Sequence, residues 1–122
     1  SPSKLSSTIE AVKKFHKKKL LVVYELHSSS SFNKKFLKTY KDTLSYSDDS
    51  IIYLSESILK NKKIKKPSIN EMRSSFNCKK IKYVNDPKKL ETLISKKISI
   101  NHNKLFMSSG NFDGFNIQKI VK

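Results

Sequence analysis

The sequence predicts an α/β domain built on a mostly parallel sheet with helices on both faces. Helical patterns alternate with short apolar runs in the order αβαβαβαβα, and such alternation implies parallel strands joined by helical crossovers. The first apolar run, Leu20–Leu26, has no polar residue before Glu25, which is typical of a strand buried on both faces. At 122 residues, the chain is expected to form one domain, residues 1–122, around a single core.

The first helix is expected to run from Pro2 to about His16. Ser1 and Pro2 form a helix-start signal, and apolar residues follow at helical spacing: Leu5, Ile9, Val12 and Phe15. After the strand at Leu20–Leu26, a polar turn leads into a second helix. Its apolar stripe is expected to face the core and comprises Phe32, Phe36, Tyr40 and Leu44.

Asp48 and Asp49 come next, before a second buried strand at Ile51–Leu54. Adjacent carboxylates could hold a metal or share a proton. Neighbours that lead into a strand point to opposite faces, however, so we interpret this pair as turn residues. The lysine-rich stretch Ser55–Pro67 is poorly periodic and is expected to be a surface excursion with a short helix.

The second half of the chain continues the alternation. Ser68 and Glu71 resemble a capping box that opens a helix to about Phe76. A third strand at Ile81–Val84 precedes a helix that starts with Asp86 and Pro87 and turns Leu90, Leu93 and Ile94 inward. A fourth strand, Leu105–Met107, breaks into a glycine-containing loop, and a terminal helix is expected from Phe115, Ile117, Ile120 and Val121.

The formal net charge of +16 invites a nucleic-acid interpretation. The basic residues are 25 lysines and a single arginine, Arg73, whereas arginine is preferred for bidentate contacts to bases and phosphates. Abundant lysine, asparagine and isoleucine with only two glycines instead indicate the codon bias of an AT-rich genome. Nucleic acid is therefore not an expected partner, although the charge could steer anionic ligands toward the protein.

Several kinds of chemistry are disfavoured by the motifs. The sequence contains neither a Gly-x-x-x-x-Gly-Lys-Ser/Thr loop nor Gly-x-Gly-x-x-Gly, so the chain alone is not expected to bind ATP or a dinucleotide in the usual way. No serine lies in a nucleophile elbow, and Cys78, His16 and His102 lack metal-site spacing. We expect no catalytic residue, no metal site and no membrane span, and a cytoplasmic location.

Two polar loops are the site candidates, because loops that follow parallel strands gather at one edge of the sheet. The early loop contributes His27, Ser28, Ser31 and Asn33, and the late loop contributes Ser108, Ser109, Gly110 and Asn111. Hydroxyls and free N–H groups at a helix start suit a carboxylate or phosphate, and both glycines of the chain lie in the late loop. The alternative is structural: a serine caps the helix, and His27 makes an ordinary hydrogen bond.

Three stretches of the chain form a recognisable set: residues 1–4 (Ser-Pro-Ser-Lys), the turn at 25–33 that begins Glu-Leu-His and ends Phe-Asn, and residues 107–112 (Met-Ser-Ser-Gly-Asn-Phe). Together they resemble the C-terminal domain of the Mur ligases, which join amino acids or peptides to UDP-N-acetylmuramate with ATP. The likeness spans nearly the whole chain. It is greatest to the L-alanine-adding and tripeptide-adding branch of Bacteroidetes-type bacteria, and it implies a Rossmann-like domain excised from a longer three-domain enzyme.

The resemblance implies that His27 lies near the carboxylate of the substrate being added. Alanine-adding enzymes carry an arginine four residues after this histidine, where this chain has Ser31, so the peptide-adding relative is favoured. ATP and Mg2+ would be bound mainly by the central ATPase domain, and the isolated chain is not expected to be active. The competing hypotheses are a stand-alone α/β module for small anions and, less favoured, a lysine-rich nucleic-acid-binding protein.

Overall fold

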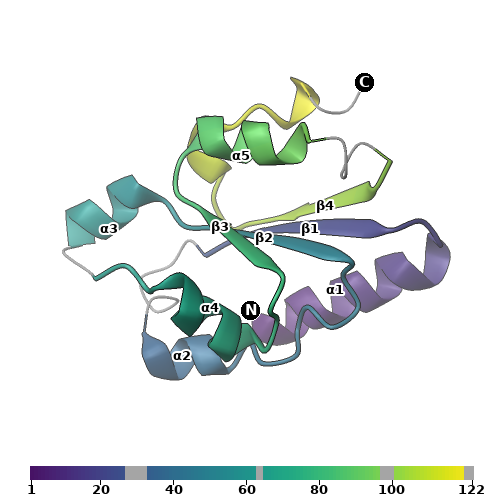
Figure 1. The fold of residues 1–122 in the computed structure, drawn as a ribbon, viewed down its shortest axis with the longest axis horizontal. Coiled ribbons are helices and arrows are strands. Elements are labelled where there is room, and N and C mark those ends of the chain that lie inside the picture. Colours follow the sequence, from purple (N-terminus) through teal and green to yellow (C-terminus); the bar gives the residue numbers. More distant parts are fainter. Residues whose placement is uncertain (27–32, 63–64, 97–100, 120–122) are drawn as a thin grey trace.

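The computed structural model describes residues 1–26, 33–62, 65–96 and 101–119. Its centre is a four-stranded, all-parallel sheet in the order β3-β2-β1-β4, shown in Figure 1. The strands are β1 (Leu20–Glu25), β2 (Asp49–Tyr53), β3 (Ile81–Val84) and β4 (Asn103–Met107). The helices are α1 (Pro2–Phe15), α2 (Lys34–Lys38), α3 (Glu56–Lys62), α4 (Ile69–Phe76) and α5 (Pro87–Ile94).

Both faces of the sheet are covered, as the sequence predicted. Side chains alternate along β1, so that Leu20, Val22 and Tyr24 pack into one core cluster and Leu21 and Val23 into the other. Helices α1, α2 and α4 lie on the first side of the sheet, and α5 lies on the second (Figure 1). A parallel sheet can be buried in this way because its crossover helices return over its faces.

Helix α1 begins as expected, with the Ser1 side chain accepting a hydrogen bond from the Lys4 N–H at 3.3 Å. Leu5 and Ile9 are fully buried under the sheet. Phe15 shares the helical spacing of these residues, but it is 79 % exposed at the last turn of the helix. The apolar spacing therefore continues beyond the part of α1 that packs against the core.

The second helix is much shorter than predicted. Helix α2 covers only Lys34–Lys38, and turns occupy the following residues to Tyr46. Asp42 has a left-handed φ of 65°, and its N–H donates to the Phe76 carbonyl oxygen at the end of α4. This tertiary bond stops the helix, while Tyr40 and Leu44 remain buried as the apolar stripe predicted.

The remaining elements follow the expected order. Ser68 and Asp86 cap α4 and α5 by accepting from the Glu71 and Lys89 N–H groups at 3.0 and 2.9 Å. Helix α3 is the short helix within the lysine-rich stretch. The predicted terminal α-helix is wrong in its described part, where residues 117–119 form a 3-10 turn; Ile120 and Val121 lie outside the described residues. Within the part of the chain that the structure describes, no helix combines the length and apolar character that crossing a membrane requires.

Asp48 lies in a bend before β2, as predicted, whereas Asp49 is the first residue of the strand rather than a turn residue. The Asp48 carboxylate accepts from Lys13 Nζ at 2.6 Å and from the Leu20 N–H at 2.7 Å. Asp49 instead pairs with the buried ring of His102, with Oδ2 2.9 Å from Nε2. Each carboxylate therefore joins a different pair of elements at the amino end of the sheet, rather than sharing one site.

We expect Asp48→Asn to lower the free energy of unfolding at neutral pH and to make that free energy less sensitive to acid. Partial burial alone would raise the pKa of Asp48, but the hydrogen bonds from Lys13 and Leu20 outweigh it, and the pKa is lowered. A lowered pKa means that the carboxylate stabilises the fold above its unfolded pKa, about 3.9, and that this contribution is lost as the pH falls through the folded pKa. Urea unfolding should show a cost of about 1 kcal/mol at neutral pH, shrinking in acid. The control is Glu10→Gln, which changes an exposed carboxylate on α1, the helix that carries Lys13; an equal loss there would contradict the assignment.

Candidate functional site

The two predicted loops begin side by side at the carboxyl end of the sheet. Strands β1 and β4 are parallel neighbours, and Tyr24 pairs with Met107 in their register. The residues that follow, Glu25 and Ser108, therefore leave the sheet next to each other. The two loops therefore start from adjacent positions at the same end of the sheet, as expected, and residues 27–32 of the early loop lie outside the described residues.

Glu25 is the residue that anchors the late loop. Its side chain is only 3 % exposed, and its Oε1 accepts hydrogen bonds from the Ser108 hydroxyl at 2.5 Å and from the Phe112 N–H at 2.9 Å. These bonds join residues more than eighty positions apart in the sequence. A buried carboxylate requires such donors, because leaving it without them costs several kcal/mol.

The late loop is also organised from within. The Ser108 hydroxyl oxygen accepts from the Gly110 N–H at 2.7 Å, and Asn111 Oδ1 accepts from the Gly114 N–H at 3.3 Å. Ser109, Gly110 and Asn111 are exposed at its tip. The side chains of Ser108 and Asn111 thus hold the loop in shape, while Ser109 and the backbone of the tip face solvent, where a ligand could reach them.

The end of the late loop has an unusual backbone. Phe112, Asp113 and Gly114 all have left-handed φ angles, of 54°, 54° and 80°. The expectation that a glycine meets a conformational need is confirmed at Gly114, whereas the other two residues bear the cost of this conformation. Phe112 is held by packing, with its ring 5.7 Å from that of Tyr53 and 5.9 Å from that of Phe106.

A second anchor, absent from the sequence prediction, centres on Asp113. Its carboxylate accepts from the Tyr53 hydroxyl at 2.6 Å and from the Ser55 hydroxyl at 2.9 Å, so it ties the late loop to the end of β2. Burial, together with this hydrogen bond to Asp113, raises the pKa of Tyr53, so the phenol remains protonated. Tyr53 was assigned to a buried strand only, and nothing local in the sequence indicates its partner sixty residues away.

Asn85 extends the polar network to β3. Its Nδ2 donates to the Leu54 carbonyl oxygen at 3.1 Å, and its Oδ1 accepts from Lys66 Nζ at 2.7 Å. Each of the four strands therefore ends beside a hydrogen-bonded polar side chain, in groups centred on Glu25, Asp113 and Asn85. The carboxylates of Glu25 and Asp113 accept hydrogen bonds from the fold itself, an arrangement that suits positioning a ligand rather than exchanging protons with it.

The early loop is only partly visible in this geometry. His27, Ser28 and Ser31 lie outside the described residues. Asn33 caps α2, with its Oδ1 accepting from the Lys35 N–H at 2.8 Å, so the capping role that we considered for a serine belongs to Asn33. Among the residues that the structure describes, no three His, Cys, Asp or Glu side chains are grouped to hold a metal ion.

Comparison with known proteins places the fold. No protein-family model and no curated protein matches the chain. A domain described as a UDP-N-acetylmuramate:L-alanyl-γ-D-glutamyl-diaminopimelate ligase domain, from Haemophilus ducreyi 35000HP, matches with a TM-score of 0.63 at 22 % identity, over 99 % of this chain and 81 % of that one. A murein peptide ligase from Psychrobacter arcticus 273-4 matches with a TM-score of 0.69 at 16 % identity, over 98 % of this chain. This chain spans only 25 % of that ligase. The chain therefore has the α/β fold of Mur-ligase-type domains.

Proposed function

We propose that this chain is the substrate-binding C-terminal domain of an ATP-dependent ligase that adds an amino acid or peptide to UDP-N-acetylmuramate in the cytoplasm. The observation that carries the proposal is the fastening of the late loop beside the end of β1, where Glu25 accepts hydrogen bonds from Ser108 and Phe112. Sheets of this kind bind ligands outside the carboxyl ends of their strands. The fold likeness to two ligases named for this chemistry supports the same assignment.

In this proposal the domain positions the substrate amine and supplies no reacting side chain. The carboxyl group of UDP-N-acetylmuramate would be activated as an acyl phosphate and then attacked by the substrate amine. The exposed loop tip at 109–111 would hold that amine substrate through the Ser109 hydroxyl, and domain closure would exclude water. Because the sequence contains no phosphate loop, a central domain of a longer protein would bind ATP and Mg2+. The gene for that protein should encode a Gly-Lys-Thr or Gly-Lys-Ser loop upstream of this domain.

A peptide is the favoured substrate over free L-alanine. Ser31 stands where the alanine-adding enzymes carry an arginine, and an uncharged serine cannot form the bidentate contact that an arginine makes to the carboxylate of a small amino acid. Both structural neighbours are named as ligases of a murein peptide. We therefore propose the tripeptide L-alanyl-γ-D-glutamyl-diaminopimelate as the preferred amine substrate.

NMR titration of the isotope-labelled chain tests this proposal. The tripeptide should shift the amide signals of Ser109, Gly110 and Asn111 with a dissociation constant of order 1 mM, as expected for one domain of a larger site. Ser109→Trp should weaken binding about tenfold by filling the loop tip, while Ser74→Trp on exposed α4 should not. Equal shifts with acetate or phosphate would favour the stand-alone anion module, and an unperturbed loop would contradict both assignments.

A further inference from the structure

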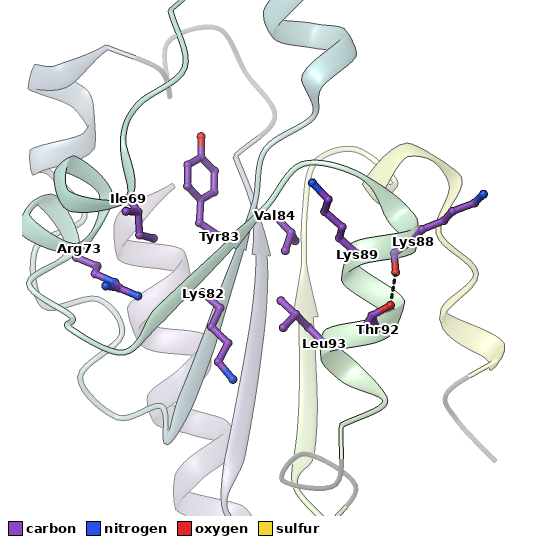
Figure 2. Close-up of a pocket in the computed structure, with 9 residues that line it drawn as sticks. All are labelled: Ile69, Arg73, Lys82, Tyr83, Val84, Lys88, Lys89, Thr92 and Leu93. Atoms are coloured by element: carbon purple, nitrogen blue, oxygen red, sulfur yellow. Dashed lines mark hydrogen bonds between the residues drawn. The ribbon is translucent and has the colours of Figure 1, made fainter.

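A basic groove crosses the other edge of the sheet, away from the polar loops. It has a volume of about 550 Å³ and lies between α4 and α5 over the edge strand β3. Figure 2 shows Val84 and Leu93 side by side in its floor. Four cations surround that apolar floor: Arg73, Lys82, Lys88 and Lys89.

Nearby acidic side chains balance only part of the positive charge of the groove. None of the described residues that line it is acidic. The nearby Asp86 pairs with Lys89 at 3.9 Å, and Glu71 pairs with Lys34 at 3.8 Å. Across the described part of the chain, the exposed amino groups of Lys82 and Lys88 have no ion-pair partner. An anionic occupant would thus meet charges that the fold leaves available.

The backbone of β3 is also open toward the groove. The Val84 carbonyl oxygen accepts from the Leu54 N–H on the β2 side. The backbone groups of successive strand residues point to opposite edges, so those of Ile81 and Tyr83 point away from β2. Arg73 occupies the Ile81 carbonyl oxygen, donating from Nε and Nη2 at 3.1 and 3.0 Å. The N–H and C=O of Tyr83 therefore remain as the hydrogen-bonding pair that an added strand would use.

We propose that this groove binds an extended acidic peptide segment, which adds beside β3 as a fifth strand. Its backbone would pair with Tyr83, and its carboxylates would meet Lys82 and Lys88 on the α5 side of the sheet. Its apolar residues, which alternate to the other side, would cover Ile69 and Tyr83 beside α4. Single-stranded nucleic acid fits less well, because Arg73 is committed to Ile81 and the Tyr83 ring already faces Lys66 at 5.3 Å. The inference does not rest on the proposed ligase function, since β3 and β4 are opposite edges of the sheet.

Fluorescence anisotropy with a labelled Glu-Val-Glu-Val-Glu-Val peptide tests the groove near physiological salt. The double variant K82E/K88E should weaken binding at least about tenfold, because rim charges steer and hold the ligand. The matched control K4E/K17E changes the net charge equally on exposed lysines of α1 and the turn that follows it, and it should change affinity less than about twofold. Circular dichroism establishes that both variants are folded.

A peptide with alternate N-methylated amides separates strand addition from charge attraction. It should bind at least about tenfold more weakly, because methylation removes the backbone donors that pair with an edge strand. The proposal is overturned if the methylated peptide binds equally well or if K4E/K17E loses as much affinity as K82E/K88E. It is also overturned if oligothymidylate binds more tightly than the peptide and loses that binding in K82E/K88E. If no peptide binds, the proposal is likewise overturned, and the cations serve only to prevent edge-to-edge pairing of β3 with another chain.

Discussion

Glu25→Ala is expected to lower the free energy of unfolding by about 3 kcal/mol, the largest effect expected among the polar side chains that the structure describes. The side chain is buried, and its Oε1 accepts from Ser108 and from the Phe112 N–H. Alanine removes that acceptor and leaves two donors at a site with little access to water. Urea unfolding at neutral pH measures the loss.

The late loop should respond to Glu25→Ala more than the rest of the fold. Hydrogen exchange at the Phe112 amide should accelerate well beyond the change in global stability, because that amide loses its acceptor. Glu25→Gln is the matched control: it keeps an acceptor oxygen, loses the charge, and should cost only about 1 kcal/mol. If alanine and glutamine cost the same, the hydrogen bonds to Oε1 do not hold the loop.

Phe112→Ala should cost about 3 kcal/mol or more, since a buried aromatic ring leaves a cavity. Phe112 is 3 % exposed and packs edge-on against Tyr53 and Phe106. That packing holds three consecutive left-handed residues, a conformation that costs each non-glycine residue about 1 kcal/mol or more. Thermal unfolding gives the stability, and hydrogen exchange at Gly110 and Gly114 reports the shape of the loop.

Phe76→Ala provides the comparison for Phe112→Ala. Phe76 is fully buried in the other core cluster, where its ring stacks on Tyr40 with centroids 4.9 Å apart. Its loss should destabilise the fold by a similar amount, about 3 kcal/mol, without changing the relative exchange of the late loop. The assignment of Phe112 as a loop anchor fails if both variants alter the loop amides to the same extent.

Together, Glu25, Phe112 and Asp113 give the late loop a fixed shape. The loop is fastened to the ends of β1 and β2 by two separate carboxylates. A rigid loop with an exposed tip can orient a substrate amine at low entropic cost, because the loop does not need to be ordered on binding. This physical link connects the predicted stability effects with the proposed role in ligation.

Much of the fold could be predicted because its signals are local. Ser68 and Asp86 cap their helices through residues three positions away, and the apolar run of β1 indicates burial on both faces without knowledge of its neighbours. The shortened α2 could not be predicted in this way. Helical spacing continues through Tyr40 and Leu44, but the bond from Asp42 to Phe76 depends on where α4 packs.

The sequence by itself determined the parallel α/β order of this protein and the start of its two polar loops at the same end of the sheet. Periodicity and turn residues suffice for that result, because strand direction and crossover handedness leave few topologies. Only the tertiary structure decided that Glu25 and Asp113 hold the late loop, and that a basic groove opens beside β3. Those features join residues separated by up to eighty-seven positions, and such contacts exist only once the strands have paired.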